Sequence, residues 1–375
     1  MFKSNIKHLQ DDLFNHYRTM KPSIAKMLEK SWAPIFYEEV FCMINEEIYA
    51  PLYCLDNGRP NTPVNILLSL EIIKHQFGFT DQEILEQFYF NYQILYALGI
   101  RNLGEVYIAE RTLYEFRERI FSYILKHPDQ EDILFKQFGI LTANFIAKAG
   151  IKTNEQRMDS TLVSPNIKKA GRLSLAHDVL RQAVKIIPKG SLSDTLKPVL
   201  EDYFKNELLF KTRNRELDSR LQKVLDLITE VDELSQKIPG LASRGEIAIL
   251  RRFLNEQARY NQEQGKWFAK AVAEIESSSL QSAYDQEATF RKKAGKSNSG
   301  YVLNLSETCS PENEVQFITD YKLEPNNKSD IEIAQDRLPV IKQKTDLTDM
   351  YADGGYHSRR AAIEGTNSAL NNLYD

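Results

Sequence analysis

The chain has 375 residues, of which 42% are hydrophobic and 27% are charged, and this composition excludes an intrinsically disordered protein. At roughly 150 residues per domain, the length predicts two or three domains. The sequence holds 48 Lys and Arg against 52 Asp and Glu, so its net charge is −4. A uniformly basic nucleic-acid-binding protein is therefore excluded, and any contact with DNA or RNA must come from local patches.

The cysteines and the apolar segments indicate a reducing, aqueous compartment. Cys42, Cys54 and Cys309 are too few and too scattered for a disulfide scaffold or a cysteine-type zinc site. The N-terminal segment lacks the apolar core of a signal peptide. No apolar run approaches the roughly 18 residues that a membrane span needs. We therefore expect a cytoplasmic protein that does not enter a membrane.

Residues 1–140 are predicted to form an N-terminal helical domain. Its helix starts and stops are predicted from a cap at Thr62 before Pro63, a left-handed stop at Gly78, and capping boxes from Thr80 to Glu83 and from Thr112 to Glu115. The tight turn after Gly78 is compatible with a DNA-binding helix-turn-helix or with two helices of a small bundle. The second helix is acidic and aromatic, which makes it a poor surface for a DNA major groove. Better candidates for phosphate contacts are Arg101, Arg111, Arg117 and Arg119.

Residues 141–180 and 285–375 are predicted to form a mixed α/β domain around one sheet. Its strands are expected at 155–163, 300–307, 314–323 and 347–353, where apolar and polar residues alternate most clearly in the two middle segments. Ser329 and Glu332 form a capping box for a helix that precedes the last strand. Together with the N-terminal domain, this order predicts an α+β fold.

A helical insertion is predicted over residues 181–284, between the first two strands. Its first long helix should pack through an apolar seam of 4-3 spacing: Leu217, Leu221, Val224, Ile228 and Val231. Pro239 and Gly240 break this helix, and a returning helix follows. The predicted helical hairpin is typical of a packing or spacer element.

Two carboxylates lie on predicted strands of the sheet. Asp159 is on the first strand, and Asp353 is at the C-terminal end of the last one. Carboxylates at strand ends face the crevice where ligands bind in open α/β sheets. Such a pair could hold Mg²⁺ or Mn²⁺, and a third acid would complete a two-ion site for phosphodiester chemistry. The alternatives are that Asp159 is a cap and that Asp353 belongs to a turn with Gly354.

The sequence resembles DDE-type bacterial insertion-sequence transposases with an InsH-like N-terminal helical domain. The matching motifs are NGRP (57–60), ALGI (97–100), TLYEFR (112–117), MDST (158–161), GY (300–301), YADGGY (351–356) and AIEGTNSAL (362–370). Each motif alone is weak, but their order and number make the resemblance specific. They span most of the chain outside the helical insertion.

The resemblance implies an RNase H-like catalytic domain with an acidic triad that binds Mg²⁺ or Mn²⁺. Carried over by motif, Asp159, Asp353 and Glu364 are the catalytic, metal-binding residues. The implied activity is DNA cleavage and strand transfer in transposition, a form of DNA recombination. The implied partner is double-stranded DNA, at the element ends and at the target, and we expect a homo-oligomer. An arginine that precedes the glutamate in related transposases matches Arg360.

The sequence departs from this family at its third motif. Ten residues separate Asp353 from Glu364, where related proteins place a much longer segment with further strand and helices. The lysine expected after the glutamate is Asn371, and the sequence ends at Asp375, where the family continues. Residues 357–360 resemble the junction of an internal deletion. We therefore expect a derivative that keeps the fold but transfers strands weakly, with Glu364 on a short helix that is poorly packed.

Two basic clusters flank the predicted catalytic strands. The residues expected to contact DNA phosphates are Lys168, Lys169 and Arg172 after the first strand, Arg291, Lys292, Lys293 and Lys296 before the second, and Arg360. The alternative for each cluster is a solvated basic loop.

Three functions remain open at this point. The first is transposase chemistry at the acidic triad. The second is a DNA-binding remnant without catalysis, which occupies element ends or pairs with an intact transposase. The third is a helical interaction protein whose acids are caps.

Overall fold

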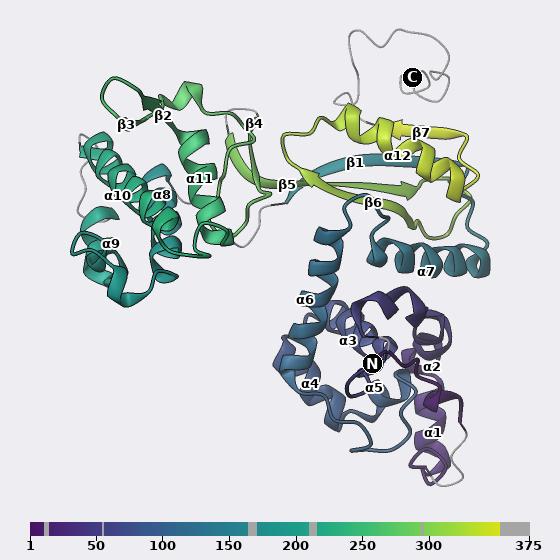
Figure 1. Ribbon diagram of the computed structural model, residues 1–375. Coiled ribbons are helices and arrows are strands. Elements are labelled where there is room, and N and C mark those ends of the chain that lie inside the picture. Colours follow the sequence, from purple (N-terminus) through teal and green to yellow (C-terminus); the bar gives the residue numbers. More distant parts are fainter. Residues whose placement is uncertain (11–14, 55, 164–170, 210–215, 294–295, 353–375) are drawn as a thin grey trace. The chain divides into compact units, whose positions relative to one another are not determined.

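The computed structural model describes residues 1–10, 15–54, 56–163, 171–209, 216–293 and 296–352 (Figure 1). The fold is α+β, as predicted. The chain divides into two compact units. Met1–Lys152 and Pro311–Thr319 form the first, and the remaining described residues form the second. None of the helices in these ranges combines the length and apolar composition needed to span a membrane.

The first unit is built mainly from helices. They are α1 (Pro22–Glu29), α2 (Trp32–Glu39), α3 (Val64–Phe77), α4 (Asp81–Phe90), α5 (Tyr92–Ala97), α6 (Glu110–Lys126) and α7 (Ile133–Ala149). Because α7 is grouped with these helices, the unit extends beyond the boundary predicted at residue 140. α4 buries Ile84, Leu85 and Phe88 in the common core, as expected for a bundle.

Local helix signals in this unit were predicted partly correctly. The capping box is present, because the Glu83 amide donates to Thr80 Oγ1 at 3.2 Å and the Thr80 amide donates to Glu83 Oε2 at 2.7 Å. Gly78 adopts the predicted left-handed conformation, with φ of 70°. The box predicted at Thr112 is wrong, because α6 already begins at Glu110.

The predicted cap of α3 is also wrong. No side chain of the preceding residue caps this helix, and Thr62 is not its N-cap. Instead, the buried Glu46 carboxylate accepts hydrogen bonds from the amides of Val64 at 2.8 Å and Asn65 at 3.3 Å. Its other oxygen accepts from the Asn5 amide at 2.6 Å. A carboxylate in this position satisfies free amides of the first turn and opposes the positive end of the helix dipole.

The second unit contains the predicted sheet. Its strands are β1 (Glu155–Val163), β4 (Thr289–Lys293), β5 (Lys296–Thr308), β6 (Ile318–Pro325) and β7 (Asp349–Ala352). The order is β4-β5-β1-β7, and β6 also pairs with β5. β1 runs antiparallel to β5 and parallel to β7. All four predicted strands thus belong to one sheet despite the insertion, whereas β4 was not predicted.

Helix α12 (Asp330–Lys344) covers one face of this sheet (Figure 1). The predicted capping box of Ser329 and Glu332 is present at its start. Its residues Ala334 and Ile341 pack against Met158 of β1 and Met350 of β7. Since side chains alternate along a strand, the residues that flank Met158 point to the opposite face.

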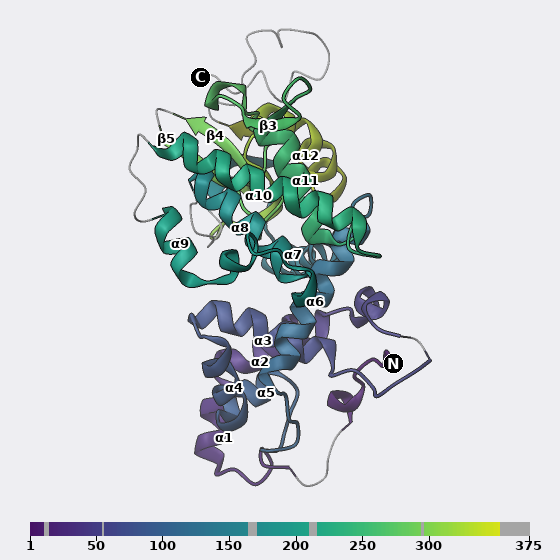
Figure 2. The same cartoon turned by 60° about the vertical axis from the view of Figure 1, so that its left-hand side comes forward.

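The helical insertion packs around its own apolar core. Its main elements are α8 (Arg172–Lys185), α9 (Asp202–Leu209), α10 (Leu217–Lys237), α11 (Gly245–Gln257) and the hairpin of β2 (Ala258–Asn261) and β3 (Lys266–Ala269). Figure 2 shows α8, α10 and α11 side by side, and all three supply this core. α10 and α11 are the predicted hairpin, although Leu217 of the predicted seam is exposed. Because α8 belongs to this core, the insertion begins before residue 181.

Candidate functional site

Asp159 lies in the middle of β1, a strand with neighbours on both sides. Its side chain is exposed, while the preceding Met158 is buried under α12. The Asp159 carboxylate therefore lies on the face of the sheet opposite α12. Its Oδ1 accepts a hydrogen bond from the Ser160 amide at 2.7 Å. No Lys or Arg of the described ranges forms an ion pair with it.

The register of the sheet is described up to the residue before the second predicted acid. In the parallel pair of β1 and β7, Met158 is the partner of Ala352. Asp159 and Asp353 are the next residues of their segments. Asp353 and Glu364 lie outside the described residues, so the predicted triad is described at Asp159 alone. Within the described part of the chain, no three His, Cys, Asp or Glu side chains gather as metal ligands would.

The face that carries Asp159 also carries a cross-strand ion pair. Arg157 of β1 donates from Nε to Oε1 of Glu307 on β5, at 2.6 Å. The two residues are direct partners in the antiparallel register, and the next pair on the same face is Asp159 with Leu305. The pair occupies Arg157, the one basic residue of β1. Asp159 therefore has no basic partner on its own strand.

The residues predicted to contact phosphates near the sheet differ in their exposure and hydrogen bonds. Arg172 is turned inward, where its guanidinium donates to the backbone carbonyls of Lys270, at 2.7 Å, and Gln257. Burial lowers the pKa of this guanidinium. The structure thus gives Arg172 a structural role at the base of the β2–β3 hairpin, which corrects the prediction of a DNA contact.

The second basic cluster is partly accessible. Arg291 is half-buried and lies 3.8 Å from the Asp330 carboxylate, whereas Lys292 is exposed. The other predicted DNA contacts lie outside the residues whose side chains are described: Lys168, Lys169, Lys293, Lys296 and Arg360.

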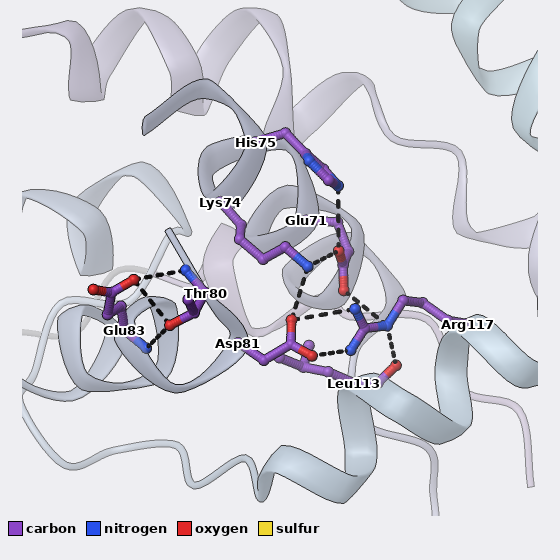
Figure 3. Close-up of polar contacts among 8 residues, drawn as sticks. All are labelled: Glu71, Lys74, His75, Thr80, Asp81, Glu83, Leu113 and Arg117. Carbon is purple, nitrogen blue, oxygen red and sulfur yellow. Dashed lines mark hydrogen bonds and ion pairs between the residues drawn. The ribbon is translucent and has the colours of Figure 1, made fainter. Parts of the chain in front are cut away.

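The first unit contains a charged network that joins three helices (Figure 3). Arg117 of α6 binds Asp81 at the start of α4 through both carboxylate oxygens. Lys74 of α3 reaches the same carboxylate at 2.7 Å and Glu71 at 3.2 Å. The hydrogen bonds from Arg117 and Lys74 lower the pKa of Asp81.

This network changes the interpretation of the arginines in the helical domain. The Arg117 guanidinium donates hydrogen bonds to Asp81 and to the Leu113 carbonyl. Arg101 donates to the Tyr96 carbonyl at 3.0 Å and stacks on the Tyr96 ring. Both are structural, contrary to their prediction as phosphate contacts. Arg111 and Arg119 remain exposed.

Residues 26–119, which include the whole network, match the family described as Transposase domain (DUF772). The similarity to a transposase domain covers about a quarter of the chain. This match supports an insertion-sequence transposase family, whose name implies an interaction with DNA. No curated protein and no solved structure shows significant similarity to the chain.

Two residues with structural roles in the first unit were not found from the sequence. Glu46 is separated in the sequence by 18 residues from Val64, at the start of the helix that it caps, so no local motif marks it. The pairing of Asp81 with Arg117 joins positions in different helices. The one available signal was the position of Asp81 in the first turn of α4, where an acid is favoured.

Proposed function

We propose that the chain is an insertion-sequence transposase whose second unit cleaves DNA in a metal-dependent reaction at Asp159. The observation that carries this proposal is the placement of Asp159: an exposed carboxylate without a basic partner among the described residues, on a central strand whose parallel neighbour leads directly to Asp353. Asp353 and Glu364 are the proposed further acids, from the motifs of the sequence. This extends the transposase-domain match, which lies within the first unit.

The donor set suits a hard divalent cation. Asp159 offers a carboxylate on a strand that two neighbours hold in place, and oxygen is the ligand that Mg²⁺ and Mn²⁺ prefer. When bound, such an ion would stabilise the charge that develops on the attacking and leaving oxygens of a phosphodiester. Asp159 and Asp353 would hold it, and Glu364 would complete the site. The exposed Lys292 and the basic residues outside the described ranges would position the double-stranded DNA.

A second candidate function is a DNA-binding form that does not transfer strands. The observation that favours it is the segment of ten residues between Asp353 and Glu364. A parallel crossover needs a dozen or more residues, so this segment cannot carry one. Without such support Glu364 lacks the fixed geometry that catalysis requires. We propose that in this form catalysis is lost, and that DNA binding and homo-oligomer formation persist.

The test is nicking of supercoiled plasmid DNA by the full chain in Mg²⁺ or Mn²⁺. We expect Asp159→Asn to reduce the rate by about 100-fold or more, the order of magnitude for loss of a preorganised electrostatic group. The matched control is Glu307→Gln on the same face of the sheet, which should retain most of the rate. Nicking that does not depend on the metal, or that survives in Asp159→Asn, would contradict the proposed chemistry. DNA binding without nicking would favour the second candidate.

A further inference from the structure

A groove of about 950 Å³ opens in the first unit, between the segment that precedes α3 and the start of α6. Its lining includes Tyr53, Arg59, Tyr107, Glu115 and Arg119. The volume lies near the upper end of the range for pockets that enclose small ligands, about 300–1,000 Å³. The groove can thus hold a few nucleotides of one strand, but it cannot enclose a double helix.

The charges around the groove favour an anionic ligand. Each of its two acids already has a partner, since Lys7 lies 2.5 Å from Glu105 and Arg111 lies 2.7 Å from Glu115. Arg119 lies further from Glu115, at 3.8 Å, and about half of its side chain is exposed. Arg59 is exposed at the rim.

Arg119 is also held in position by an aromatic ring. Its guanidinium carbon lies 5.1 Å from the centre of the Tyr53 ring, within the range of a cation–π contact. Burial raises the pKa of the Tyr53 hydroxyl. The charge and hydrogen bond of Arg119 partly offset this rise. A guanidinium positioned in this way presents its remaining donors to the groove.

A second aromatic group forms a stacking platform beside these cations. Tyr107 is 80% exposed, although its ring lies nearly parallel to that of Tyr89, with 5.9 Å between the ring centres. Tyr89 is fixed by its hydroxyl, which donates to the Ile108 carbonyl at 2.5 Å and accepts from the Ile108 amide at 3.3 Å. Tyr107 is thus a backed aromatic ring with most of its surface open. Proteins that bind single-stranded nucleic acid use such rings, together with a basic groove, to stack unpaired bases.

We propose that this groove binds unpaired DNA, with a base stacked on Tyr107 and phosphates paired with Arg59 and Arg119. Stacking on a tyrosine requires a base that is free of its duplex neighbours. The groove is also too small for a double helix, so it too requires unpaired DNA. The choice of DNA as the nucleic acid rests on the proposed function. The groove gives the transposase domain a role of its own, in addition to the phosphate contacts near the sheet.

The test measures binding of the full chain to a short fluorescent oligothymidylate by anisotropy, with divalent metal removed. A hairpin duplex of matched length is the competitor. We expect the single strand to bind more tightly than the duplex. Tyr107→Ala should weaken its binding about 5- to 150-fold, the range for loss of one base–aromatic stack, whereas Tyr107→Phe should bind like the wild type. Arg119→Gln should reduce the slope of log affinity against log salt by about 0.7.

Tyr114→Ala is the matched control, because Tyr114 is an exposed tyrosine of α6 that does not line the groove. It should bind oligothymidylate like the wild type. Equal or tighter binding of the duplex, no binding of the single strand, or equal affinity in the wild type and Tyr107→Ala would overturn the groove assignment. A chain that nicks DNA through Asp159 but ignores oligothymidylate would overturn the groove and leave the proposed function intact. Oligothymidylate binding without metal, in a chain that does not nick DNA, would support the groove and contradict the proposed DNA cleavage.

Discussion

Arg337 of α12 and Asp320 of β6 form a bidentate ion pair between the helix and the sheet. Nε donates to Oδ2 at 2.9 Å, and Nη2 donates to Oδ1 at 2.5 Å. The Asp320 side chain is 1% exposed, and that of Arg337 is 12% exposed. Charges this deeply buried are costly unless each retains its partner, so the pair fixes how α12 lies on β6.

We expect Arg337→Met to lower the free energy of unfolding by about 3–5 kcal/mol, because it leaves the Asp320 carboxylate buried without its partner. The double variant Asp320→Leu/Arg337→Met should be less destabilised than Arg337→Met alone. Asp336→Asn is the control, since the Asp336 side chain is 62% exposed in its pair with Lys328, and pairs with a solvent-exposed member contribute about 1 kcal/mol or less. Urea denaturation of the three variants measures the difference. A loss for Arg337→Met no larger than that for Asp336→Asn would show that the buried pair is not important for stability.

The Asp81 network predicts a pH dependence of the first unit. The pKa of the Asp81 carboxyl is lowered in the folded chain by hydrogen bonds from Arg117 and Lys74, whereas an Asp in an unfolded chain titrates at about 3.9. The stabilisation from Asp81 is therefore fully present above the unfolded pKa, and it is lost as the pH falls through the lower folded pKa. Denaturation between neutral pH and pH values below about 3.9 should show a smaller acid-induced loss in Asp81→Asn than in the wild type. Parallel pH profiles of the two proteins would contradict this assignment.

The proposed weakness of strand transfer predicts a small effect of Glu364→Ala. If Glu364 is not held among the catalytic acids, its removal should leave metal-dependent nicking close to the wild-type rate. The assay joins labelled DNA ends to a target plasmid and scores nicks and joined products separately. Efficient joining in Mg²⁺ that Glu364→Ala abolishes would show that the short segment after Asp353 still supports a working triad.

The elements that could be predicted from the sequence are those whose signals are local. The boxes at Thr80 and Ser329 depend on contacts three residues apart, and both are present in the structure. Alternation predicted the strands around Val302 and Thr319, and the strand that carries Asp159 was placed correctly in the same sheet. Such patterns follow from the geometry of a single helix or strand, so they need no knowledge of distant neighbours.

The errors share one physical cause, which is competition from partners far away in the chain. Thr62 is not the cap of α3, because the amides of the first turn donate to the Glu46 carboxylate instead. Arg172 and Arg117 were expected at a DNA surface, but carbonyl and carboxylate oxygens from other elements occupy their guanidinium groups.

By itself, the sequence determined the α+β class, the helical first unit, the single sheet and the strand that presents Asp159. The tertiary structure decided which charged groups are available to a ligand. A charged side chain forms its strongest hydrogen bonds with whichever oppositely charged group the fold brings within reach, and this depends on contacts between distant segments. Asp159 and Arg119 remain accessible for this reason, while Asp320 and Arg337 are buried together.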